Sequence, residues 1–342
     1  MKRFLFLLPL ILFFTCDKKD PVSPDNDVPV VRKYTVSTTP STDDPNYFDL
    51  TCDIEPLQTD NFKSSSFRAK IPKNDKPVKG ILVLSPGIQE DGTADGTQLV
   101  EEQEWIDFAT KHNFAMVGIK FRVVDSVDDW NDHTYIAQSG SGYAFNEALK
   151  VFFNETKVMN FYKLPLIMWG YSWGGAFNYH FSLKWSQQVV CLASVKSGYA
   201  YDAYYGTQIA SKSPCILFYG ENEDETHKLS ISGVFKNQRN NSALWCIAGE
   251  VGAGHELGNT SKIAKPFMAS VIEKRIPENL GDYSDLVAIE ESSGWLGNVE
   301  DFTISPYQSF EGDKSKASWL PDESVAKNWQ LFVQGKISEM TP

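Results

Sequence analysis

The stretch Gly170-Tyr171-Ser172-Trp173-Gly174-Gly175 decides the fold of this chain. Residues 164–169 before it form a short apolar run that is typical of a buried strand. Residues 176–183 after it have the apolar spacing of a helix packed on a sheet. A G-x-S-x-G pattern between a strand and a helix predicts a nucleophile elbow, which is a strained turn that exposes a serine above a sheet. The glycines fit this turn because strand and helix close tightly around it and leave no room for Cβ atoms.

Strand-like and helix-like segments alternate on both sides of this elbow. Apolar runs typical of buried strands occupy residues 81–84, 114–119, 189–193, 215–219 and 243–247. Helical spacing is found at about residues 98–112, 143–156 and 261–274. This alternation predicts an α/β fold with a mostly parallel sheet and helices on both faces. Residues 34–71 contain β-rich runs broken by Pro, Asn and Ser, which predict an antiparallel opening of the sheet.

Ser172 is the candidate nucleophile, and it needs a general base because an unassisted hydroxyl is weakly nucleophilic at neutral pH. The candidate base is His255, since Gly252-Ala253-Gly254-His255-Glu256 follows the last predicted strand and can present an imidazole over the sheet edge. The other histidines are less suited. His112 and His180 are expected on helices, and His133 is expected in an aromatic loop. His227 follows the candidate acid too closely to face it.

The acid that orients the imidazole is expected in Glu221-Asn222-Glu223-Asp224-Glu225, directly after a predicted strand. Glu223 is the candidate if the acid stands three residues past Gly220, and Asp224 is the candidate if the turn is one residue longer. The sequence leaves this choice open. The chain order serine, acid, histidine is the order expected for a hydrolase elbow.

An oxyanion hole requires two backbone N–H groups that point at the developing negative charge. The first is expected from Trp173, the residue after the nucleophile. The second is expected from Ile88, in the loop Ser85-Pro86-Gly87-Ile88-Gln89 that follows the first parallel strand. Gly87 would let this loop approach a substrate closely.

Together these motifs resemble the α/β-hydrolase superfamily over about residues 78–275. The resemblance implies an eight-stranded sheet, a serine triad and acyl transfer through a covalent acyl-enzyme. Ser85-Pro86-Gly87 departs from the His-Gly that many members carry. Within this superfamily the chain resembles secreted bacterial esterases and polyester depolymerases, which implies a small-molecule or polymer ester as the substrate. The alternatives are a peptidase or acyltransferase with the same triad, and a non-catalytic surface-binding lipoprotein.

The first residues are typical of an export signal. Met1-Lys2-Arg3 is basic, and residues 4–14 are apolar but too few to span a bilayer as a helix. Phe14-Thr15-Cys16 resembles the end of a bacterial lipoprotein signal, with Cys16 as the lipidated first mature residue; a plain signal peptide is the alternative. We therefore expect a leader at 1–15 and a lipid-anchored protein of the cell envelope, on its periplasmic or surface side.

The rest of the chain is expected to be one domain on a tether. Residues 16–33 are polar and contain prolines, as in a flexible tether. Residues 34–342 are predicted to be the hydrolase domain, with an extension from about residue 277 that docks on it and ends in a short amphipathic helix. Two aromatic segments, 121–145 and 199–205, are either walls of a substrate site or ordinary packing. The first of these contains Trp130, His133, Tyr135 and Tyr143.

Charge and motifs exclude several other functions. The net charge is −12, and it becomes −14 without residues 1–15, so the surface repels nucleic acid and anionic lipid. The sequence has no H-E-x-x-H, paired C-x-x-C, P-loop or dinucleotide fingerprint, so no metal or cofactor is expected. Three cysteines lie in apolar runs and are predicted to be buried hydrophobic residues: Cys191, Cys215 and Cys246.

Overall fold

The computed structural model describes residues 32–38, 46–73, 76–123, 134–158, 160–198 and 213–341. The predicted leader, Cys16 and nearly all of the tether lie outside these residues, as do Trp130, His133 and residues 199–205. Arg32–Pro342 is one compact unit. In the described part of the chain, no helix combines the length and the apolar character that a membrane span requires.

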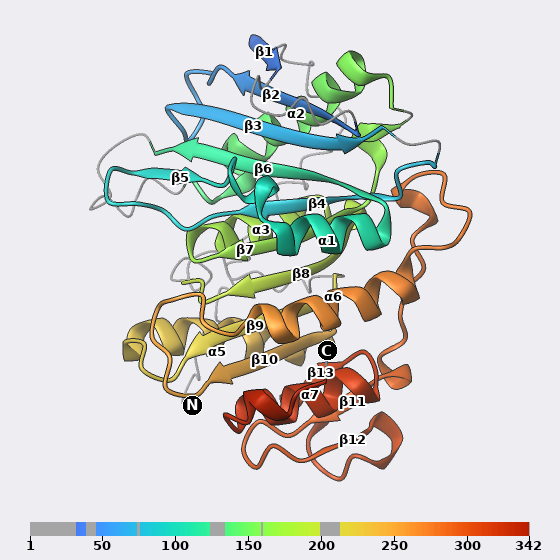
Figure 1. Cartoon of the computed structure of the whole chain (residues 1–342). Helices are drawn as coiled ribbons and strands as arrows, with labels where there is room; N and C mark the ends of the chain where they lie inside the picture. The colour runs from blue at the N-terminus through green and yellow to red at the C-terminus, as the bar shows by residue number, and fades with distance from the viewer. Residues whose placement is uncertain are drawn as a thin grey trace, which may run out of the picture. The chain divides into compact units, whose positions relative to one another are not determined.

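A single large sheet runs through this unit (Figure 1). Its order is β1-β2-β3-β6-β4-β7-β8-β9-β10, with the short β5 paired to β6. Strands β6, β4, β7, β8, β9 and β10 are parallel, whereas β1, β2 and β3 pair antiparallel, as the sequence predicted. The bounds are β1 Tyr34–Thr38, β2 Tyr47–Ile54, β3 Ser64–Pro72, β4 Gly80–Ser85, β5 Thr93–Asp95, β6 Phe114–Arg122, β7 Leu166–Tyr171, β8 Val189–Val195, β9 Cys215–Gly220 and β10 Trp245–Glu250.

Helices cover both faces of this sheet. The side chains of β4 show the division, because Ile81 and Val83 pack into one apolar core and Leu82 and Leu84 into the other. The first core includes helices α2 (Ser141–Thr156), α3 (Trp173–Lys184) and α5 (Glu225–Asn240). The second includes α1 (Gln103–His112) and α6 (Ser261–Arg275). The predicted α/β fold class is confirmed, and β1 and β5 are additions to the eight strands that the resemblance implied.

The C-terminal extension contains more regular structure than the sequence indicated. It forms a three-stranded sheet of order β12-β11-β13 and then helix α7. Their bounds are β11 Trp295–Gly297, β12 Ile304–Pro306, β13 Ser318–Leu320 and α7 Glu323–Val333. The extension lies against the edge strand β10, where the Trp329 indole N–H donates to Ile247 O at 2.8 Å and Ser318 Oγ lies 3.0 Å from Ile247 N.

The four cysteines among the described residues are free and buried, and Cys52 is the fourth. Burial raises the pKa of the Cys191 thiol to about 12, so this side chain stays a neutral thiol at physiological pH. The prediction that Cys191, Cys215 and Cys246 are buried is confirmed.

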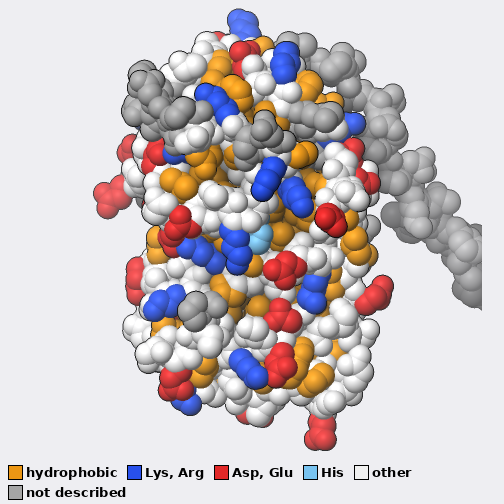
Figure 2. All heavy atoms as spheres, turned by 45° about the vertical axis from the view of Figure 1, so that its right-hand side comes forward, with side chains coloured by type: hydrophobic (Ala, Val, Ile, Leu, Met, Phe, Trp, Pro, Cys, Tyr) orange, Lys and Arg blue, Asp and Glu red, His pale blue; other side chains and the backbone are white. Residues whose placement is uncertain are grey.

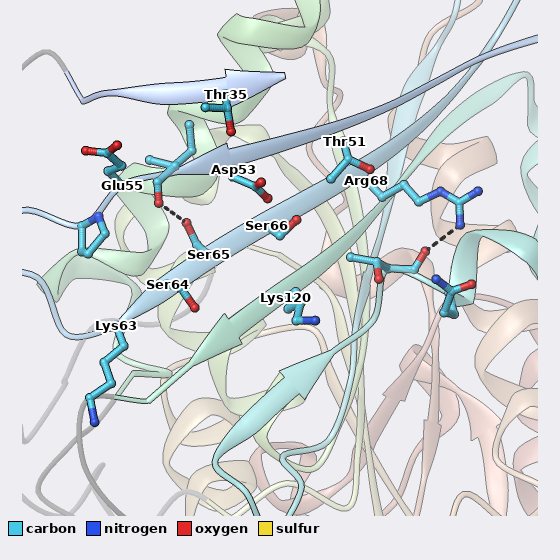
Figure 3. A pocket seen from close by; sticks show the side chains of 14 residues that line it. Thr35, Thr51, Asp53, Glu55, Lys63, Ser64, Ser65, Ser66, Arg68 and Lys120 are labelled. Atoms are coloured by element: carbon cyan, nitrogen blue, oxygen red, sulfur yellow. Dashed lines mark hydrogen bonds between the residues drawn. The ribbon is translucent and has the colours of Figure 1, made fainter. Parts of the chain in front are cut away.

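Charged side chains of both signs are interspersed on the face that Figure 2 shows. A groove of about 620 Å³ lies against β2, β3 and β6, and most of the residues that line it are polar (Figure 3). Two of its cations already have partners, since Arg68 binds Asp49 at 2.6 Å and Lys120 binds Asp95 at 2.7 Å. Ser172 does not line this groove, so it is a surface apart from the elbow.

Candidate active site

Ser172 occupies the turn between β7 and α3. Its backbone φ of 50° and ψ of −119° lie in a region that non-glycine residues rarely adopt, which is typical of a strained functional position. The N–H of Ser172 donates to Val195 O at 2.8 Å and so ties the turn to the end of β8. The residue therefore has the backbone of the predicted elbow.

Two positions of the elbow require glycine because the structure has no room for a side chain there. A Cβ on Gly170 would lie 2.5 Å from the backbone of Gly174. A Cβ on Gly174 would lie 2.2 Å from the carbonyl oxygen of Ser85, which is closer than real Cβ contacts come. Strand, helix and neighbouring loop therefore meet backbone to backbone around Ser172, as the sequence predicted.

His255 lies within hydrogen-bond distance of the serine. Its Nε2 atom is 2.9 Å from Ser172 Oγ. The loop that carries it follows β10, and the Tyr171 hydroxyl, next to the serine in sequence, donates to the carbonyl oxygen of His255. A non-catalytic scaffold would not need this spacing, whereas a general base does.

Glu223 and Asp224, the two candidate acids of the acidic run, have different surroundings. Glu223 is buried, and its Oε1 lies 2.5 Å from His255 Nδ1 while its Oε2 accepts the Gly220 N–H at 2.7 Å. The side chain of Asp224 is 68% exposed and caps helix α5 by accepting the His227 N–H at 2.9 Å. The structure thus brings Glu223 to His255 and leaves Asp224 outside the site.

The environment of Glu223 favours its charged form. Burial by itself raises the pKa of a carboxyl group, but the hydrogen bonds from His255 and from the Gly220 N–H lower it, as does the nearby imidazole of His227. The lowering causes prevail, so the pKa of Glu223 lies below its ordinary value. At neutral pH the group is a carboxylate, and it accepts a hydrogen bond from the proton on His255 Nδ1. In a neutral imidazole the free lone pair then lies on Nε2.

The two predicted oxyanion donors lie in elements that meet at the serine. Trp173 is the first residue of α3, so its N–H has no acceptor within the helix. A Cβ on Gly87 would lie 3.5 Å from Ser172 Cβ, which places the loop of Ile88 beside Ser172. Among the described residues, no backbone hydrogen bond uses the N–H of Ile88 or of Trp173.

His227 is a neighbour of the site that sequence reasoning missed. Its ring centroid lies 4.8 Å from that of His255, although it was expected to be too close to the candidate acid to face it across the site. His227 lies in the first turn of α5, so its approach to the site could have been expected only if the start of that helix had been predicted.

One group of described residues offers donor atoms suited to a metal ion. One donor atom each from Glu223, His227 and His255 lies within 4.8 Å of the other two. Zinc binds nitrogen at about 2.0–2.1 Å, so these side chains would have to move together, and the bond between Glu223 and His255 would have to break. The donor set fits an orienting carboxylate better than a metal site.

The two tyrosines of the first aromatic segment that the structure describes pack against α3 and its end. Tyr135 lies 5.5 Å from the ring of His180, and Tyr143 lies 5.3 Å from the ring of Trp185, measured between ring centroids. Ordinary packing therefore accounts for these two side chains.

Strand order, helices on both faces and the serine turn together define an α/β-hydrolase fold. Solved structures similar to the chain include esterase PE8, at 17% identity over 57% of this chain and 94% of that one, with a TM-score of 0.44. The fluorophosphonate-binding serine hydrolase FphF of Staphylococcus aureus is 12% identical over 70% and 98% of the two chains, with a TM-score of 0.43. S-formylglutathione hydrolase (FrmB) of the same organism is 12% identical over 71% and 99%, also with a TM-score of 0.43.

No protein-family model matches the sequence, and no curated protein matches it. At these identities the similarities concern the fold alone.

The crowding at the elbow leads to a prediction with a matched control. Gly174→Ala places a methyl group 2.2 Å from Ser85 O, so we expect loss of the folded elbow and a free energy of unfolding lower by at least about 3 kcal/mol. Gly233→Ala, on the exposed side of α5 with no atom within 4 Å, should instead stabilise the protein by about 0.4–1 kcal/mol. Urea denaturation measures both, and equal stability of the two variants would contradict the described turn.

Proposed function

We propose that this protein is a serine hydrolase that cleaves carboxylic esters through an acyl-enzyme intermediate. The observation that carries the proposal is the linear arrangement of three side chains, with Ser172 Oγ 2.9 Å from His255 Nε2 and Glu223 Oε1 2.5 Å from His255 Nδ1. Nucleophile, base and orienting acid are the parts that an activated serine requires.

The first half of the reaction forms the acyl-enzyme. Ser172 Oγ attacks the ester carbonyl carbon while its proton moves to His255 Nε2. Glu223 stabilises the resulting imidazolium, and the N–H groups of Trp173 and Ile88 bind the oxyanion. Collapse of the tetrahedral intermediate breaks the bond to the alcohol oxygen, which takes the proton from His255 and leaves.

The second half restores the enzyme. A water molecule gives a proton to His255 Nε2 and attacks the acyl carbon, and collapse of the second tetrahedral intermediate returns the proton to Ser172 Oγ. The products are a carboxylic acid and the free serine. Every proton transfer runs through one imidazole, so this mechanism uses no metal or organic cofactor.

Replacement of the nucleophile tests this function. Ser172→Ala should lower kcat for p-nitrophenyl acetate by at least about 10⁴-fold, because no other group at the elbow can form the acyl-enzyme. Circular dichroism should be unchanged, since alanine fits wherever the serine does. A fluorophosphonate probe should label the wild-type chain at Ser172 and leave the variant unlabelled.

A substrate panel separates ester hydrolysis from related chemistries. Esters with acyl chains of increasing length, peptides and an alcohol acceptor would be compared with the same wild-type preparation. Faster cleavage of peptides, or transfer of the acyl group to the alcohol in preference to water, would replace the esterase proposal. Full retention of ester hydrolysis by Ser172→Ala would end the serine mechanism altogether.

The two adjacent carboxylates provide a matched test of the acid. Glu223→Gln removes the charge that stabilises the imidazolium, and we expect kcat to fall by about 10⁴-fold. Asp224→Asn keeps a good helix cap for α5 and should leave kcat within about twofold. Measurements of kcat from pH 6 to 9 decide the assignment, and the reverse pattern would transfer the role to Asp224.

We also propose that the protein is anchored in the cell envelope through a lipid on Cys16, after removal of residues 1–15. This rests on the basic and apolar segments that precede Cys16 in the sequence. Expression with a membrane-targeting export system should yield the wild-type chain in the membrane fraction and Cys16→Ser in the soluble fraction. Equal partition of the two forms, with an unmodified N-terminus by mass spectrometry, would contradict the anchor.

A further inference from the structure

A buried ion pair lies at the strand ends beneath the loop that carries His255. Lys196 follows β8 and Glu250 ends β10, and the Nζ and Oε2 atoms are 2.9 Å apart. The lysine side chain is 0% exposed and that of the glutamate 4%. Because β9 lies between β8 and β10 in the sheet, the pair reaches across the end of a whole strand.

Among the described residues, the other hydrogen bonds of these two side chains go to the His255 loop. Lys196 Nζ donates to the carbonyl oxygen of Glu256 at 2.5 Å. Glu250 Oε1 accepts the N–H of Asn259 at 2.6 Å and its side-chain amide at 3.2 Å. Glu256 and Asn259 stand one and four residues after His255, so both charges hold the backbone just beyond the imidazole.

Stability alone is a poor explanation for such a pair. Taking two charges out of water is costly, and apolar side chains of similar volume often serve a fold as well. Lys196 also has a backbone φ of 50°, a conformation that is unfavourable for a lysine. The feature that a purely structural ion pair would not need is its set of hydrogen bonds to the His255 loop.

We propose that Lys196 and Glu250 are positioning residues that hold the His255 loop so that the imidazole stays in reach of both Ser172 and Glu223. The proposal rests on the proposed hydrolase function. Neither side chain contacts the nucleophile, and each acts through the backbone of the loop. A displacement of about 1 Å in a reacting group can cost about a hundredfold in rate, so a held loop matters to this site.

The test removes the pair without leaving a buried charge. In Lys196→Met/Glu250→Gln both charges are gone, and the glutamine Oε1 still has the Asn259 N–H to accept. We expect kcat for p-nitrophenyl acetate, per folded molecule by circular dichroism, to fall on the order of a hundredfold with KM changed far less. Should the double variant fail to fold, Glu250→Gln alone is measured; it leaves the Lys196 ammonium with the Glu256 carbonyl and the glutamine Oε1 as neutral acceptors, and the expected fall in kcat is about tenfold.

Arg239→Met is the matched control. Arg239 is equally buried and pairs with Glu291 at 2.8 Å, but its other bonds go to the carbonyl oxygens of Ala243, Ala317 and Lys314. Its loss should lower the free energy of unfolding and leave kcat per folded molecule unchanged. An unchanged kcat in the Lys196 and Glu250 variants, or an equal fall in Arg239→Met, would overturn the positioning role.

A second readout does not depend on catalysis. In the Ser172→Ala background, the proton shared by His255 Nδ1 and Glu223 should give a downfield ¹H resonance, assigned by ¹⁵N-histidine labelling. We expect the double variant to lose this resonance and Arg239→Met to keep it. Its persistence in the double variant would refute the inference, whereas absence of esterase activity in the wild type would refute only the proposed function.

Discussion

The close approach of helix α3 to strand β7 is the constraint on which the site depends. Gly170 and Gly174 meet without room for a Cβ, and Ser172 between them has a backbone conformation that non-glycine residues rarely adopt. Gly174 also packs closely against Ser85 O, so the loop that carries Ile88 is held next to the same turn. One backbone contact thus sets the position of the proposed nucleophile relative to the loop proposed to bind the oxyanion.

Much of the fold could be predicted because the central strands are continuous apolar runs. β4, β7, β8 and β9 lie in the middle of the sheet, and β10 lies at its edge. All five are covered on both faces, and so their sequences show burial directly. β5, β11, β12 and β13 have three residues each, too few for any periodicity. Helix α5 was not predicted, because only a few apolar residues, such as Ile231, Val234 and Phe235, mark its buried face.

The candidate site, too, could be predicted from the sequence only in part. Ser172 and His255 could be proposed from residue type, strand ends and chain order, since the topology of a parallel sheet brings strand ends together. The choice between Glu223 and Asp224 could not, because it depends on the residue at which α5 begins. Asp224 becomes the cap of that helix, and the residue before it then turns inward to His255. His227 comes to the site through the first turn of the same helix.

The C-terminal extension has a consequence for self-association. A strand at the end of a sheet normally offers free N–H and carbonyl groups with which another chain can pair. At the middle of β10 both groups of Ile247 are already engaged, the N–H by Ser318 and the carbonyl by the indole of Trp329. A second molecule could extend the sheet at this edge only by displacing β13 and α7, so growth of the sheet from chain to chain is blocked on the side nearest His255.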